Sequence, residues 1–300
     1  MYDFIAIGNV SIDLYFKGKT LTQSEDRFQL AIGGKYFADV FYEDIGGGGC
    51  NVAAGVAGFG YNVGLLCKIG NNSFKELILQ KLKTKKISTD VCQYQDNYYK
   101  ISAILLTDKG ERTIINYETP STLWEGFNLS DDVKKAKNIF LSSLPNVALS
   151  DKKKIITYFK GADVLTFVNL AATDCRRSVS ELTEIFEGLD ILFVNSHEYS
   201  ELIKKPYSEI NFKTYSVDLP ILKDRVLIVT DGEKGSYGYF NNQVNYQPAI
   251  TVPVILDTTG CGDAYSAGFI AEYMRSKDIK KSMENGADYA SKIIQKIGAN

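Results

Sequence analysis

Short apolar runs, most of them almost uninterrupted, recur along this chain with amphipathic segments between them. Six runs have the length of strands, at 4–10, 63–69, 139–144, 164–170, 191–194 and 226–230. Helical patterns stand between several of them, at 74–83, 151–159, 179–186 and 198–204. Strands without polar alternation are typical of parallel sheets that helices cover on both faces. The alternation therefore predicts a three-layer α/β core.

Two segments interrupt this rhythm and are poor helix formers. Residues 14–45 are rich in aromatic side chains, and residues 98–117 resemble two strands around an Asp108-Lys109-Gly110 turn. We expect both to form a small β-sheet that projects as a lid over the ends of the core strands. A hairpin extension without a role at the site is the alternative. The core then consists of residues 1–13, 46–97 and 118–300.

The charge balance excludes several classes of partner. The 34 Lys and Arg against 36 Asp and Glu give a net charge of −2, without a basic face for nucleic acid. No apolar run is long enough for a membrane span, and Asp3 and Asp13 interrupt the first apolar stretch, unlike a signal peptide. We expect a cytoplasmic protein whose five scattered cysteines stay reduced.

The single histidine, His197, excludes zinc or iron sites that need two or three imidazoles. It stands at an expected helix start and is interpreted as a surface or capping residue. Sites built from glycines or carboxylates remain.

The strongest chemical signal is the segment 257–263, which reads Asp-Thr-Thr-Gly-Cys-Gly-Asp and runs into a helical pattern. Unpaired N–H groups and the positive dipole end make a helix start an anion site, and Gly260 and Gly262 let the backbone approach the anion. Asp263 could accept a proton from an attacking hydroxyl, although the helix start should lower its pKa and make it a weak base. A simple N-cap after a glycine turn gives the same pattern.

A second signal is the run of four glycines from Gly46 to Gly49, followed by Cys50 and Asn51. A surface without side chains lets a ligand rich in hydroxyls approach the backbone, and Asn51 can fix its orientation. A flexible loop is the alternative. Neither a Walker A motif nor a dinucleotide Gly-x-Gly-x-x-Gly motif occurs.

Weaker signals stand at the ends of other expected strands. Asn195 and Glu198 form an Asn-x-x-Glu pattern that also occurs by chance. Residues 230–235 could wrap a phosphate chain or form a hairpin turn into the next strand. Asp13 follows the first strand, where it could bind hydroxyls or lie exposed in a loop.

Taken in order, these pieces resemble the ribokinase-like (PfkB) family of sugar and nucleoside kinases. Residues 46–60 look like the first family signature, and residues 257–270 look like the second, with Cys261 in place of an alanine. The resemblance spans nearly the whole chain. It implies a Rossmann-like core with a β lid, ATP as the donor, and transfer of the γ-phosphate to a substrate hydroxyl.

The resemblance also implies roles for single residues. Asp263 would be the catalytic base, beside an anion hole of backbone N–H groups from Gly260, Cys261 and Gly262. Asp13, Gly47, Gly48 and Asn51 would contact the substrate. The nucleotide would be bound by Asn195, Thr230, Gly232, Gly235 and Asn285. Asn195 and Glu198 would place Mg²⁺ through water, and Asp257 lies near the family's monovalent-cation (K⁺) loop.

The acceptor is left open between a sugar and a nucleoside. Gly48 stands where ribokinases carry a lysine. Residues 167–171 lack both the Asp and the Arg of the Asp-x-Asn-x-Arg pattern that several fructokinase-like and ketodeoxygluconate kinases carry. The segment Asn169-Leu170-Ala171-Ala172 looks somewhat like adenosine kinases. We expect a kinase for a primary hydroxyl of a sugar or sugar-like molecule, with a nucleoside kinase as the alternative. A binding protein without turnover and a dehydrogenase are readings from other classes. The aromatic residues of the expected lid, Phe37, Phe41, Tyr98, Tyr99 and Tyr117, could stack on a base or join two lids in a homodimer.

Overall fold

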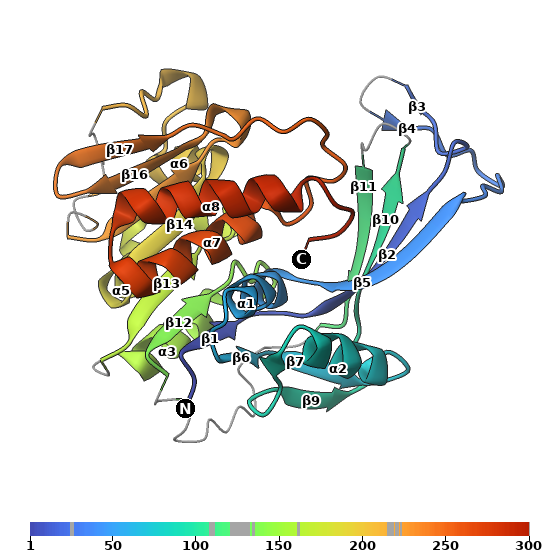
Figure 1. Ribbon diagram of the computed structural model, residues 1–300, viewed down its shortest axis with the longest axis horizontal. Helices are drawn as coiled ribbons and strands as arrows, with labels where there is room; N and C mark the ends of the chain where they lie inside the picture. Colours follow the sequence, from blue (N-terminus) through green and yellow to red (C-terminus); the bar gives the residue numbers. More distant parts are fainter. Residues whose placement is uncertain are drawn as a thin grey trace.

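The computed structural model describes residues 1–24, 27–107, 112–120, 133, 136–160, 163–214, 219, 222 and 224–299. The expected Asp108-Lys109-Gly110 turn lies outside these residues. Figure 1 shows a large body with a smaller sheet that projects to one side of it. None of the described helices is long and apolar enough to cross a membrane.

A nine-stranded sheet forms the centre of the body. Its strands, in spatial order, are β17 (Gln243–Gln247), β16 (Ser236–Phe240), β15 (Val226–Thr230), β14 (Ile191–Asn195), β13 (Leu165–Asn169), β12 (Asn138–Leu141), β1 (Phe4–Ile7), β6 (Val63–Leu66) and β8 (Ile87–Ser88). The pairings from β8 to β15 are parallel, and β16 and β17 are antiparallel. β1, β6 and β12 are buried throughout, because helices cover both faces.

Helices cover the sheet on two sides and complete the predicted three layers. One apolar cluster joins the sheet to α1 (Gly48–Gly58), α2 (Lys75–Thr84), α7 (Cys261–Ser276) and α8 (Ile279–Ile293). The other joins it to α3 (Leu149–Phe159), α4 (Ala172–Cys175), α5 (Val179–Gly188) and α6 (Ser196–Ile203). Two short 3-10 helices, Tyr207–Glu209 and Gly232–Lys234, lie in the loops.

Two expected apolar runs differ from the observed strands. The first strand ends at Ile7, and the chain starts a new strand of the smaller sheet at Ser11. The run 63–69 is divided at Cys67 into β6 and β7 (Lys68–Asn71), and β7 pairs with β9 (Gln93–Asp96) in a separate two-stranded sheet. Apolar character alone could not reveal this division, because both strands are buried up to Gly70.

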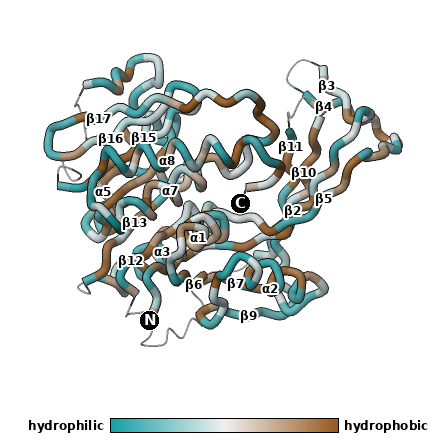
Figure 2. Tube along the Cα trace, in the orientation of Figure 1, coloured by the Kyte–Doolittle hydropathy of each residue, from teal (hydrophilic) through white to brown (hydrophobic). Residues whose placement is uncertain are grey.

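The smaller sheet has four strands in the order β11 (Arg112–Glu118), β10 (Lys100–Leu106), β2 (Ser11–Lys17) and β5 (Val40–Gly46). A minimal hairpin of β3 (Gln23–Ser24) and β4 (Arg27–Phe28) lies between β2 and β5 in the chain. Figure 2 shows hydrophobic residues along β10 and β5. This sheet overlaps the predicted lid segments 14–45 and 98–117, but it begins earlier, at Ser11, and extends to Gly46 and Glu118.

The C-terminal segment lies between the smaller sheet and the body (Figure 1). Ile297 packs against Tyr15, Ile104 and Leu106 of the smaller sheet. Gly298 donates its N–H to the Asp257 carboxylate at 3.2 Å. The segment therefore contacts both the smaller sheet and the loop before α7.

Candidate functional site

Two helix starts meet at the centre of the site. Helix α1 begins at Gly48 after Gly47, whose φ is 96°, and α7 begins at Cys261 after Gly260, whose φ is 72°. The side-chain amide of Asn51 donates a hydrogen bond of 2.8 Å to Oδ2 of Asp263. The first turn of each helix leaves N–H groups without intrahelical acceptors. The two sequence signatures, about 210 residues apart, thus form one polar junction.

The ionisation of Asp263 differs from the expectation. The helix start was expected to lower the pKa of this carboxyl, but burial raises it to about 6, and the hydrogen bond from Asn51 opposes that rise in part. Asp263 is partly exposed as a whole residue, while its carboxyl group is surrounded by protein. The expectation of a lowered pKa, and with it of a weak base, was therefore wrong.

The glycine turn before α7 packs closely against the C-terminal segment. A Cβ on Gly260 would lie 2.3 Å from the Ala299 Cβ, and the positive φ of Gly260 already disfavours other residues. The Cys261 N–H donates to the Thr258 carbonyl at 3.3 Å and is thus used within the turn. The space beside Gly262 is open to 4 Å, so a ligand has room next to this residue.

Asp13 lies inside β2 and is buried, rather than in an exposed loop. The Ser11 hydroxyl donates to it at 2.8 Å. Burial raises the pKa of Asp13, while hydrogen bonds from Ser11 and Ser102 act in the opposite direction. A Cβ on Gly46 would lie 1.9 Å from Oδ2 of Asp13, so a side chain at position 46 would displace this carboxylate.

Strand register extends Asp13 into a row of polar residues across the smaller sheet. Asp44 on β5 and Ser102 on β10 stand opposite Asp13, and Asn116 on β11 stands opposite Ser102. Residues directly opposite one another share a face of the sheet. The row therefore offers hydroxyl, amide and carboxylate groups on one face.

A small cavity next to Asp263 brings several of the predicted residues together. It measures about 120 Å³. Its lining comprises Asn169, Phe193, Val194, Asn195, Glu198, Thr230, Gly262, Asp263 and Ser266. Residues predicted at 195–198, 230 and 262–263 thus line one cavity at the carboxyl ends of β13, β14 and β15. A ligand in this cavity would meet the oxygen-bearing side chains together with the apolar Phe193 and Val194.

Asn195 and Glu198 cap helix α6 reciprocally. Asn195 accepts from the Glu198 N–H, and the Glu198 carboxylate accepts from the Asn195 N–H, both at 2.8 Å. Burial raises the pKa of Glu198. His197 between them is exposed, and its ring lies 5.3 Å from that of Tyr207.

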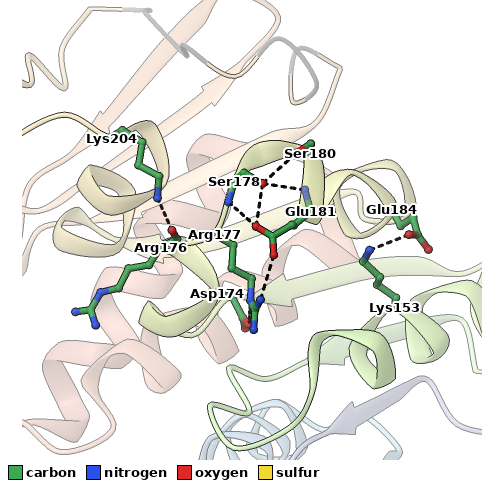
Figure 3. A network of polar contacts seen from close by, with 9 residues as sticks. All are labelled: Lys153, Asp174, Arg176, Arg177, Ser178, Ser180, Glu181, Glu184 and Lys204. Atoms are coloured by element: carbon green, nitrogen blue, oxygen red, sulfur yellow. Dashed lines mark hydrogen bonds and ion pairs between the residues drawn. The ribbon is translucent and has the colours of Figure 1, made fainter.

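A wider surface hollow of about 470 Å³ lies elsewhere, lined by residues of α3 and α5 such as Lys153, Tyr158 and Glu184. It contains none of the predicted site residues. Figure 3 shows the polar network beside it, in which Lys153 pairs with Glu184 and Ser178 caps α5. These contacts stabilise helices of one layer and involve no predicted site residue. We therefore place the candidate site at the smaller cavity.

The remaining predicted nucleotide residues are spread more widely. Residues 231–235 connect β15 to β16, as the hairpin reading expected. Gly232 and Gly235 have positive φ, and a Cβ on Gly235 would lie 2.2 Å from the Gln247 carbonyl oxygen. Asn285 donates to the Gly268 carbonyl at 2.7 Å and so joins α8 to α7.

The structure adds residues that sequence reasoning did not propose. Asn169 lines the cavity and donates to the Phe193 carbonyl at 2.9 Å. Ser266 also lines it, one helical turn after Gly262, whose carbonyl accepts from its hydroxyl. Ser266 could have been predicted from the sequence, because it follows Gly262 by one turn of the expected helix. Ser102, which stands opposite Asp13, and Arg112, which donates to the Thr258 hydroxyl, could be found only from strand pairing and the position of the smaller sheet.

Comparison with known proteins agrees with this geometry. The model of the pfkB family of carbohydrate kinases matches residues 5–300. The chain belongs to the pfkB family of carbohydrate kinases. The expected enzyme class and three-layer core with a small sheet are thereby confirmed.

Several members of this family are similar over nearly the full length. A nucleoside kinase from Methanocaldococcus jannaschii is 25% identical over 300 residues, covering 99% of this chain and 92% of the relative. The structure of Arabidopsis thaliana ribokinase complexed with ribose and ATP superposes with a TM-score of 0.79 at 21% identity, covering 99% of this chain and 94% of that one. Thermotoga maritima ribokinase gives 0.81 at 19%, covering 100% and 95%. These two structures share the fold.

Proposed function

We propose that this pfkB-family kinase transfers the γ-phosphate of ATP to a primary hydroxyl of a sugar or sugar-like acceptor. The observation that carries the proposal is Asp263, held by Asn51 at the junction of two helix starts. A base, an anion site and a glycine surface for a polyol are then adjacent. In-line phosphoryl transfer to a hydroxyl needs that hydroxyl to be oriented by a base next to a held phosphoryl group.

Asp263 acts as the base in this proposal. With a pKa of about 6 it is ionised at neutral pH and accepts a proton more readily than an ordinary carboxylate. Asn51 orients it, and the backbone at the start of α7 holds the transferring phosphoryl group. The smaller sheet closes over the acceptor as a lid and excludes water.

The cavity beside Asp263 fits a hydrated Mg²⁺. Glu198, Asn195 and Thr230 offer carboxylate, amide and hydroxyl oxygens, which Mg²⁺ prefers, and Mg²⁺ usually keeps several waters. The described residues contain no group of three or more His, Cys, Asp or Glu side chains that could hold a metal directly. When bound with the phosphates of ATP, Mg²⁺ would neutralise their charge.

For the acceptor, the polar row of Asp13, Ser102 and Asn116 favours a ligand with several hydroxyls. A nucleoside is the second candidate. It is favoured by the full-length similarity to a nucleoside kinase and by the exposed Tyr42 ring, which lies on the next row of the same face. A base could pack against such a ring.

The test is ATP-to-ADP turnover across a panel of sugars and nucleosides with Mg²⁺. We expect turnover with one class of acceptor, and the better class decides between the two candidates. Ligand binding without turnover on any acceptor would contradict the proposal and favour a non-catalytic binding protein on this fold.

We also propose that the enzyme forms a homodimer through the lid. The face opposite the polar row carries Phe41, Ile115 and Tyr117, each more than half exposed. Exposed apolar patches of this kind mark interaction surfaces. Tyr98 does not belong to it, because it is buried and donates to Glu118 at 3.2 Å. Light scattering should give a dimer for the wild type and a monomer for Phe41→Glu; a monomeric wild type would contradict this.

A further inference from the structure

Asp257 is a fully buried carboxylate at the beginning of the glycine turn. Its Oδ1 accepts from the Thr259 N–H at 2.8 Å and from the Thr259 hydroxyl at 2.6 Å. Its Oδ2 accepts from the Gly298 N–H at 3.2 Å. Both oxygens are thus used inside the protein. A buried negative charge also requires a positive charge nearby.

The positive charge next to Asp257 comes from the smaller sheet. The Arg112 guanidinium lies 4.0 Å from Oδ1 of Asp257, and it also donates to the Thr258 hydroxyl. Arg112 is the first residue of β11, an edge strand of that sheet. Within the described part of the chain, Arg112 is the basic side chain that pairs with Asp257. One guanidinium therefore contacts two successive residues of the turn before α7.

This arrangement does not fit the monovalent cation that the family resemblance implies near Asp257. The carboxylate already accepts three hydrogen bonds from Thr259 and Gly298. A cation at Oδ1 would also be repelled by the guanidinium 4.0 Å from the same oxygen. The electrostatic requirement of Asp257 is met without an ion.

We propose that Arg112 replaces a monovalent cation at Asp257, so that a lid residue holds the turn 258–262 in its anion-binding shape. The inference rests on the proposed phosphoryl transfer. Arg112 is a positioning residue here, because it acts through Asp257 and Thr258. When the lid moves away, the turn loses its countercharge, so the anion site is complete only with the lid in place.

Steady-state kinetics of the wild type, Arg112→Met, Arg112→Lys and a control variant test this proposal. Wild-type turnover should change less than twofold when K⁺ is replaced by tetramethylammonium at equal ionic strength. Arg112→Met should lower kcat about tenfold or more with little change in KM for ATP, because the turn loses its shape rather than its nucleotide contacts. Arg112→Lys should keep more of the activity, since it retains the charge.

A matched control and a chemical rescue separate charge from fold. Arg27→Met removes an exposed arginine from β4 of the same lid region and should behave as the wild type. Millimolar guanidinium should restore part of the turnover of Arg112→Met and leave Arg27→Met unchanged. Strong activation of the wild type by K⁺, or an Arg112→Met variant with wild-type kcat, would overturn the inference.

The unfolding midpoint can be measured without any substrate, so the inference stays testable if no acceptor is phosphorylated. The wild-type unfolding midpoint should be the same in K⁺ and in tetramethylammonium. Arg112→Met should lower the midpoint in the wild-type background but have little effect in an Asp257→Asn background, because the pair is then already broken. Stabilisation of the wild type by K⁺ would overturn the inference, and this measurement needs no variant. Equal effects of Arg112→Met in both backgrounds would also overturn it. Both results count even if the kinase proposal fails.

Discussion

Asn51 near the start of α1 and Asp263 near the start of α7 are joined by a hydrogen bond of 2.8 Å, so the two signature segments lie in direct contact. The contact holds Oδ2 of Asp263, and Oδ1 lies 3.5 Å from the position of a Cβ on Gly48. The free edge of the carboxylate therefore faces the glycine surface on which a hydroxyl would approach. The following predictions depend on this pair and on the residues around it.

The pH dependence of turnover should report the ionisation of Asp263. Because the pKa of this carboxyl is raised to about 6, kcat/KM should fall about tenfold per pH unit below that value, not below pH 4. Asn51→Ala removes the hydrogen bond that stabilises the charged form, so its acid limb should move to higher pH. A pH–rate profile of both proteins measures this. An acid limb near pH 4 in the wild type would contradict the burial argument.

The same ionisation should cost stability at neutral pH. The folded pKa of Asp263 is raised, so its charged form is disfavoured in the folded state, and the cost disappears as pH falls below the unfolded value near 4. Asp263→Asn should therefore be more stable than the wild type at pH 7.5, by on the order of 1–3 kcal/mol, and equally stable near pH 3.5. Denaturant unfolding at both pH values checks this. A less stable variant at pH 7.5 would show that the carboxylate is compensated by other contacts.

Gly46 should be needed for the position of Asp13. In Gly46→Ala the new Cβ would collide with the Asp13 carboxylate, so KM for the acceptor should rise about tenfold or more while KM for ATP changes little. Gly58→Ala is the matched control, because it lies in α1 with nothing within 4 Å of the new Cβ. Equal kinetics for the two variants would remove Asp13 from the acceptor site.

Local patterns predicted the layers of the fold and the helix starts beside the candidate site. Uninterrupted apolar runs specified β13, β14 and β15, and the glycine turns specified the starts of α1 and α7. Each of these features depends on neighbours within a few residues, and the sequence contains that information directly.

Features that depend on distant parts of the chain were predicted poorly. The raised pKa of Asp263 depends on the protein that surrounds its carboxylate, and the sequence suggested only the opposing helix dipole. The burial of Asp13 follows from its place on β2, with β5 and β10 on either side. Arg112 of β11 meets Thr258, 146 residues further along the chain, because the smaller sheet lies beside the loop before α7. Strand pairing and packing decide all three.

The most direct test of the account is the kcat of wild-type protein and Asp263→Asn with ATP, Mg²⁺ and the best acceptor of the panel at pH 7.5. We predict a loss of at least about 10²-fold in kcat, with ATP affinity retained, because the variant keeps the polar contact to Asn51 but cannot accept the proton. Turnover at the wild-type rate in Asp263→Asn would contradict the assignment of Asp263 as the base.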